Sequence, residues 1–147
     1  YTNAESSAAS DVYKRQPVDV VWADLSALET HVEWMADAEA ITFTTHQTSG
    51  VGTTMEVETR VGPLRLNDVM EFTQWDPPTR MAIRHQGLVT GVGEFVLTDI
   101  GGNTTRFMWT EELSFPWYLG GPITEFFAAP VLTAIWKRNL ARLAARF

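Results

Sequence analysis

Three ionisable residues occupy positions where the surrounding sequence alternates apolar and polar side chains. Asp68 falls between Leu66 and Met70 in one such run. His85 and Glu111 hold equivalent positions in two later runs. Because successive side chains of a β-strand point to opposite faces, this parity predicts that all three face the core. An Asp, a His and a Glu converging on one cavity could act as acid and base, whereas the alternatives are a satisfied polar network or bulges that turn them outward.

Other catalytic chemistries lack their sequence motifs. The histidines His31, His46 and His85 form none of the HxH, HxxxH or HExxH spacings of metal sites. The chain has no Cys and no GxSxG motif, which argues against a thiolate or an elbow-type serine nucleophile. The sequence GVG occurs at 50–52 and 91–93, each time leading from a turn into a strand, so no phosphate-binding loop is indicated. We therefore expect no metal and no cofactor.

A second set of residues suggests an apolar binding pocket. Aromatic residues make up 12% of the chain, with 6 Trp, 8 Phe and 3 Tyr, and large aromatics both fill cores and line cavities. Methionine adds a flexible side chain that adapts to irregular ligands. For each residue alone, core packing is the competing interpretation. The predicted ligand-binding residues are Trp34, Met35, Met55, Leu66, Met70, Ile83, Phe95, Trp109, Phe126, Phe127, Trp136 and Asn139.

The elements that must position these residues are mostly antiparallel strands. Six segments alternate with period two, and turn sequences such as TSGVG, WDPPT and IGGN separate them. Short links between strands indicate a meander of hairpins with one face buried. The predicted strand segments are 40–47, 50–62, 63–75, 79–87, 91–100 and 104–115.

Helical spacing appears at both ends of this strand region. Apolar residues three and four apart predict two short helices over residues 17–23 and 26–34. A long amphipathic helix is predicted from Ile123 to Phe147, which Pro130 should kink or divide. An antiparallel sheet with one polar face must bury the other, and this helix is the large apolar partner available. The predicted fold class is therefore α+β, with a curved six- to seven-stranded sheet wrapped around the C-terminal helix.

Composition narrows the possible partners. The net charge is −7, which argues against nucleic acid and against an anionic membrane surface. No apolar run approaches the roughly 20 residues that span a bilayer, so no membrane insertion is expected. The absence of Cys and of a secretion signal predicts a cytoplasmic location. The oligomeric state is left open.

The pattern resembles a known superfamily. The segments PVDVVW, GVGTTMEV, GPLRLNDVMEFTQWDPPTRMAIRHQG, TTRFMWTEEL and NLARL are similar to the START-like, polyketide cyclase/dehydrase (SRPBCC) proteins, over about residues 17–147. The resemblance implies a helix-grip fold: a strand, two helices, six strands and a long helix. It also implies a first strand just before PVDVVW that bridges the second and last strands.

The opening segment does not fit this pattern. Residues 1–16 are rich in Ser and Ala and have no apolar period. We interpret them as a disordered or foreign segment in place of the first strand, with DVYKR as a short substitute at best, and residues 17–147 as one domain. Loss of the first strand's apolar side chains would leave the chain marginally stable.

Three functions remain open at this point. The first is binding of a small hydrophobic ligand, such as a lipid, a polyketide or a similar apolar metabolite, between sheet and helix. The second is a cyclase or dehydratase that uses Asp68, His85 or Glu111 in the same cavity without a metal. The third is a protein-interaction module of related fold.

Overall fold

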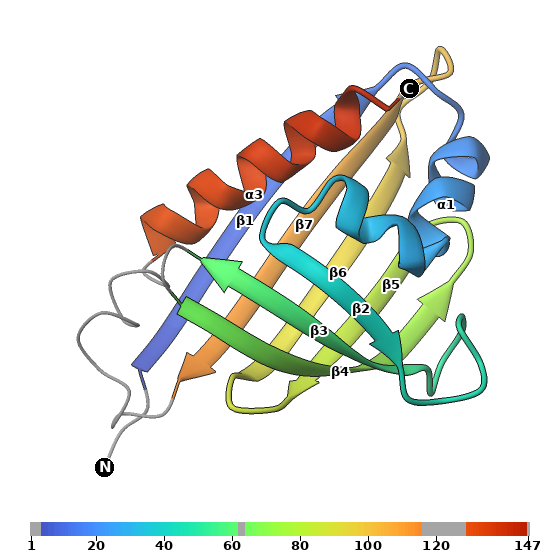
Figure 1. The fold of residues 1–147 in the computed structure, drawn as a ribbon. Coiled ribbons are helices and arrows are strands. Elements are labelled where there is room, and N and C mark those ends of the chain that lie inside the picture. The colour runs from blue at the N-terminus through green and yellow to red at the C-terminus, as the bar shows by residue number, and fades with distance from the viewer. Residues whose placement is uncertain (1–3, 62–63, 116–128, 147) are drawn as a thin grey trace.

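A computed structural model describes residues 4–61, 64–115 and 129–146, and within them the chain forms one seven-stranded antiparallel sheet with helices on its concave face. The α+β helix-grip prediction is confirmed (Figure 1). The helices are α1 (Val18–Ser26), the 3₁₀ helix η1 (Leu28–Glu33) and α3 (Ala129–Ala144). The strands are β1 (Ala4–Lys14), β2 (Ala38–Phe43), β3 (Thr54–Val61), β4 (Leu64–Asp76), β5 (Arg80–Gln86), β6 (Thr90–Asp99) and β7 (Thr105–Phe115).

The strand order differs from the sequence-based expectation at one point. The order is β1-β7-β6-β5-β4-β3-β2, so the described strands β1 and β2 are the two opposite edges of the sheet. The expected bridge of the first strand between the second and last strands is therefore wrong. β1 pairs with β7, and all other neighbouring strands in the sheet are consecutive in the sequence. These consecutive pairs are antiparallel hairpins, as the short turn sequences predicted.

The opening segment forms a strand, where the sequence led us to expect disorder. β1 pairs with β7 along its whole length, from Ala4 opposite Phe115 to Lys14 opposite Thr105. Hydrogen bonds of the backbone make this ladder, so it does not depend on an apolar period in the side chains. The Lys14 Nζ atom also donates to the carbonyl of Leu143 in α3 at 3.0 Å. A foreign origin of residues 1–16, and a domain limited to residues 17–147, stay predictions.

The helices begin and end close to the predicted positions. α1 begins after Pro17 and extends three residues further than predicted, and the second helix is a 3₁₀ turn. α3 has Pro130 in its first turn, where a missing N–H costs nothing. The part of the predicted helix before Ala129 lies outside the described residues.

Aromatic side chains join the helices to the sheet. The rings of Trp109 on β7 and Trp136 on α3 stack with centroids 5.1 Å apart. Trp34, just after η1, meets Trp109 edge to face at 6.0 Å. Such contacts favour offset and edge-to-face geometry. They hold the helices above the concave face, where the polar residues predicted from parity also point.

Candidate functional site: an apolar cavity with a buried carboxylate–histidine–carboxylate group

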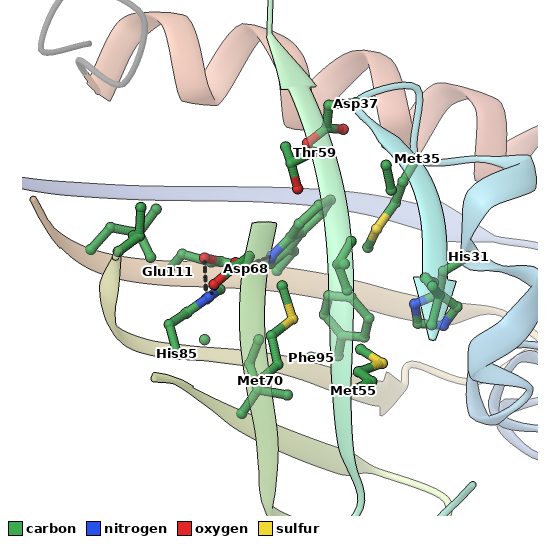
Figure 2. Close-up of a pocket in the computed structure, with 18 of the residues that line it drawn as sticks. His31, Met35, Asp37, Met55, Thr59, Asp68, Met70, His85, Phe95 and Glu111 are labelled. Carbon is green, nitrogen blue, oxygen red and sulfur yellow. Dashed lines mark hydrogen bonds and ion pairs between the residues drawn. The ribbon is translucent and has the colours of Figure 1, made fainter. Parts of the chain in front are cut away.

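The three ionisable residues predicted from strand parity lie together. His85 Nδ1 is 2.7 Å from Asp68 Oδ2, and His85 Nε2 is 3.0 Å from Glu111 Oε2. The imidazole of His85 is buried, with 3% of its side chain exposed. Figure 2 shows the ring held between the two carboxylates. We call Asp68, His85 and Glu111 the polar trio.

A glycine makes the contact between His85 and Glu111 possible. His85 is on β5 and Glu111 on β7, and β6 lies between these strands. Neighbouring strands are about 4.8 Å apart, so the two backbones are separated by roughly 10 Å. Gly93 is paired with Glu111, and a Cβ added there would lie 3.1 Å from the Glu111 carboxyl carbon. The missing side chain leaves the space that the Glu111 carboxylate occupies.

Charge pairing stabilises the ionised form of His85. Burial alone would lower the pKa of His85, but attraction to Glu111 and hydrogen bonds with both carboxylates raise it to about 10. Burial raises the pKa of Asp68, against the opposing effect of the His85 hydrogen bond. A protonated imidazole donates both of its N–H groups, which matches one carboxylate on each ring nitrogen.

The two carboxylates of the trio differ in how many of their oxygens have hydrogen-bond partners. Glu111 uses both oxygens, because Oε2 meets His85 and Oε1 accepts a hydrogen bond from Trp109 Nε1 at 3.1 Å. Asp68 uses Oδ2, whereas its buried Oδ1 has no hydrogen-bond partner among the described residues. Buried polar atoms are nearly always paired, so this oxygen is an unusual feature.

The trio belongs to the wall of a cavity between the sheet and the helices. Its volume is about 120 Å³, and most of its lining is apolar. Figure 2 shows Met35, Met55, Met70 and Phe95 around this space. The predicted site residues in the wall are Met35, Met55, Leu66, Asp68, Met70, Ile83, His85, Phe95, Trp109, Glu111 and Trp136.

Two further predicted ligand-binding residues, Trp34 and Asn139, are described by the structure but are not part of this wall. Trp34 is fully buried beside the wall residues Phe95 and Trp109, and its Nε1 has no hydrogen-bond partner among the described residues. Asn139 is also fully buried and bonds to the segment between η1 and β2. The other two predictions, Phe126 and Phe127, lie outside the described residues.

A family model described as polyketide cyclase/dehydrase and lipid transport matches residues 11–147. The chain belongs to this family. The resemblance to START-like, SRPBCC-type proteins is thereby confirmed, and the family gives the chain a hydrophobic-ligand-binding fold. The comparison with curated proteins finds no match.

Solved structures show the same fold as this member of the polyketide cyclase/dehydrase family. TTHA0849 from Thermus thermophilus has a TM-score of 0.80 at 16% identity, covering 95% of each chain. The Zhui aromatase/cyclase from Streptomyces sp. R1128 has a TM-score of 0.70 at 16% identity, covering 97% of this chain and 90% of its own. Norcoclaurine synthase from Thalictrum flavum has a TM-score of 0.70 at 14% identity, covering 99% and 98%.

In this family member the cavity wall also contains polar residues that the sequence did not single out. Thr59 follows Met55 and Val57 on the same parity of β3, so the alternation could have found it. Asp37 lies in the loop before β2, where no periodicity indicates its direction. His31 is in η1, and its spacing from the other histidines in the sequence indicates no site.

Two of these additional polar residues, Asp37 and His31, have defined hydrogen-bond partners. Asn139 Nδ2 donates to Asp37 Oδ1 at 2.7 Å, and Asn139 Oδ1 accepts from the Ala36 N–H at 3.0 Å. Burial raises the pKa of Asp37. His31 Nε2 lies 2.8 Å from the Leu25 carbonyl, which can only accept, so this nitrogen carries the proton. Burial lowers the pKa of His31 to about 4 and keeps its ring neutral.

Neither a metal site nor a membrane span is found in the described part of the chain. No group of three or more His, Asp or Glu side chains there is placed to hold a metal ion. Among the described helices, none is both long and apolar enough to cross a bilayer.

Proposed function

We propose that this protein binds a compact, largely apolar small molecule in the cavity between the sheet and α3. The observation that carries the proposal is the cavity of about 120 Å³, walled by methionine and aromatic side chains and bordered on one side by the polar trio. Ligand sites typically combine an apolar lining with a few placed polar groups that orient the ligand.

The volume suggests the size of the ligand. Sites for drug-sized molecules have about 300–1,000 Å³, whereas an engineered apolar cavity of about 150 Å³ binds benzene. The space in this protein therefore suits a molecule with a single ring. A longer polyketide or an acyl chain would fit only if wall side chains moved, and the flexible methionines Met35, Met55 and Met70 are the ones suited to move.

Filling the cavity tests the proposal. Val57 is buried in the wall, and Val57→Trp would occupy much of the space. The matched control is Val92→Trp, because Val92 on β6 is 51% exposed. Small molecules extracted from the purified proteins are compared by mass spectrometry, and binding of 4-fluorotoluene is measured by ¹⁹F NMR.

The proposal expects ligand and probe to be retained by the wild type and by Val92→Trp and to be lost in Val57→Trp. Equal retention in all three proteins would place the binding outside this cavity. Complete absence of binding in the wild type would also contradict the proposal.

A second candidate function is acid–base catalysis in the same cavity, favoured by the polar trio. The Asp68 carboxylate would take a proton from the carbon next to a ligand carbonyl, that carbon would attack a second carbonyl, and the resulting alkoxide would take the proton back from Asp68. His85 would hold Asp68 in place, while Glu111 balances the imidazolium charge. An aromatase/cyclase among the structures of the same fold supports this candidate.

Turnover of a short poly-β-ketone tests the catalytic candidate. We expect cyclisation that falls at least about tenfold in His85→Ala and in Glu111→Ala, because the Asp68 base then loses the residues that position it and balance the charge, a smaller loss than the roughly 10²–10⁴-fold contributed by an acid or base itself. Retained binding of the probe would show that the variants still fold. Binding without any turnover in the wild type would leave the carrier function alone.

A further inference from the structure

The polar atoms of the cavity wall differ in how much hydrogen-bonding capacity they have left. The donors of the trio region are all in use: His85 shares its two ring nitrogens with Asp68 and Glu111, and Trp109 Nε1 donates to Glu111. Among acceptors, Asp68 Oδ1 has no partner within the described residues. His31 donates through Nε2, which leaves Nδ1 as a lone-pair acceptor. The Thr59 hydroxyl in the same wall can either donate or accept, so the remaining hydrogen-bonding capacity of the trio and of His31 is on the acceptor side.

The charges of the lining residues also favour a ligand that donates hydrogen bonds. The lining residues include Asp37, Asp68, Glu94 and Glu111 and, among the described ones, no Lys or Arg. The Glu94 carboxylate pairs with Arg80 at 2.6 Å, so the charge of the wall comes from the other three carboxyl groups. The one cationic group among the described lining residues is the imidazolium of His85, and both of its N–H groups already face carboxylates. An anionic ligand would meet the like charge of the trio, where both N–H groups of His85 already face carboxylates, and would have the Thr59 hydroxyl as a donor in the wall. A ligand donor or cation would instead find an acceptor at Asp68.

Of these acceptors, Asp68 would be stabilised most by a hydrogen bond from a ligand. Its Oδ1 is covered from solvent and has no partner in the part of the chain that the structure describes, which is the costly state for a carboxylate oxygen. Met70 lies two residues further along β4 in the same wall, and a flexible thioether side chain can shift to let a ligand group reach that oxygen.

We propose that the ligand carries a hydroxyl or amine hydrogen-bond donor at one end of its apolar body, that Asp68 Oδ1 accepts this hydrogen bond, and that carboxylate ligands such as fatty acids are rejected. This inference rests on the proposed binding function and specifies its ligand class. A phenol and an amine share the donor chemistry, and separate probes distinguish them.

Single-ring probes of matched size test the wild-type protein at pH 7.5 by NMR titration. The probes are p-cresol as a phenol, benzylamine as an amine, 4-fluorotoluene without a donor, benzaldehyde with an acceptor, and benzoate as an anion. A site built for a donor leaves a buried polar group unpaired when the donor is missing. We expect p-cresol or benzylamine to bind at least about tenfold more tightly than 4-fluorotoluene, and benzoate to bind more weakly than 4-fluorotoluene.

A substitution at Asp68 should reverse the preference. In Asp68→Asn the amide oxygen can keep the hydrogen bond from His85, which turns the amide N–H₂ toward the position of Oδ1. The variant should lose the advantage of p-cresol and bind benzaldehyde at least about fivefold more tightly than the wild type does. The control is Glu71→Gln, which removes a carboxylate from the outward side of the same strand and should leave the order of the probes unchanged.

The outcomes separate this inference from the proposed function. Equal affinity for p-cresol, benzylamine and 4-fluorotoluene would overturn the inference and leave apolar binding intact. A wild-type preference for benzaldehyde or benzoate would also overturn it. If no probe binds, the proposed function fails as well. Should Asp68→Asn not fold, as judged by circular dichroism, the wild-type series alone decides.

Discussion

The ring of His85 on β5 and the carboxylate of Glu111 on β7 are 3.0 Å apart, although another strand separates their backbones. Gly93 on that strand has no side chain to fill the space between them. The polar trio therefore depends on a residue that carries no polar group. A substitution at Gly93 acts on the electrostatics of the site through packing alone.

Gly93→Val should separate His85 from Glu111. The added side chain would begin 3.1 Å from the Glu111 carboxyl, which is already held by His85 and Trp109. We expect the free energy of unfolding to fall by about 1–3 kcal/mol, as for other overpacked sites, although valine favours strands over glycine. Urea denaturation measures this loss, and NMR titration of the imidazole should show a lowered pKa of His85.

The matched control for Gly93→Val is Thr98→Val, which adds a valine to the exposed end of the same strand. This control should remain within about 0.5 kcal/mol of the wild type. An unchanged His85 pKa in Gly93→Val would contradict the role given to the glycine.

The stability of the protein should decline on the alkaline side because of His85. Its pKa is raised to about 10 in the fold, by Glu111 and Asp68 acting against burial. The pKa of an unfolded histidine is about 6.5, and below that pH the raised pKa of folded His85 contributes its full stabilisation. This contribution is lost as the pH rises from about 6.5 through the folded pKa. Urea midpoints measured from pH 6.5 to 10 should fall more steeply for the wild type than for His85→Gln. Parallel curves would show that His85 is not charged in the fold.

His31 should produce the opposite dependence on the acid side. Burial lowers its pKa to about 4, so the folded state holds the neutral ring. A depressed pKa gives stability that is present above the unfolded value of about 6.5 and is lost as the pH falls through about 4. The loss should approach roughly 3 kcal/mol at most, and His31→Gln should show a shallower decline between pH 6.5 and 4. A wild-type curve as shallow as that of the variant would refute the neutral buried ring.

Asn139 should matter for stability rather than for ligand contact. It is fully buried on α3 and bonds both Asp37 Oδ1 and the Ala36 N–H, which ties the loop before β2 to the helix. Asn139→Leu would leave both groups unpaired and should cost about 2–4 kcal/mol in urea denaturation. The exposed neighbour Lys137 provides the control, since Lys137→Ala should change little. A cost below about 1 kcal/mol for Asn139→Leu would mean that the loop is held in another way.

Strand parity explains why the polar trio could be predicted from the sequence. Asp68, His85 and Glu111 each share a parity with apolar neighbours, and period two then decides which face they occupy. Their direct contact required more than parity, because His85 and Glu111 are not on adjacent strands. Their contact depends on Gly93, which leaves space for the Glu111 carboxylate. From the sequence alone, a glycine in a strand could equally mark a bulge, a bend or the close approach of a ligand or another backbone.

Other features had no local signal. The ladder between β1 and β7 is made by backbone groups, so the Ser- and Ala-rich sequence of residues 4–10 did not indicate a strand. Asp37 lies in a loop, where no period predicts the direction of a side chain. Asn139 was placed on the apolar stripe of the helix correctly, but its partners come from a segment about a hundred residues earlier.

Methionine methyl NMR tests the central claim, binding in the cavity, most directly. Met35, Met55, Met70 and Met81 line the cavity, whereas Met108 on β7 alternates to the other face of the sheet and is not part of the lining. Titration of ¹³C-methyl-labelled protein with p-cresol should give saturable shifts of the four cavity methyl groups while the Met108 signal stays in place. Shifts confined to Met108, or no saturable shift at any methionine, would contradict a ligand site between the sheet and α3.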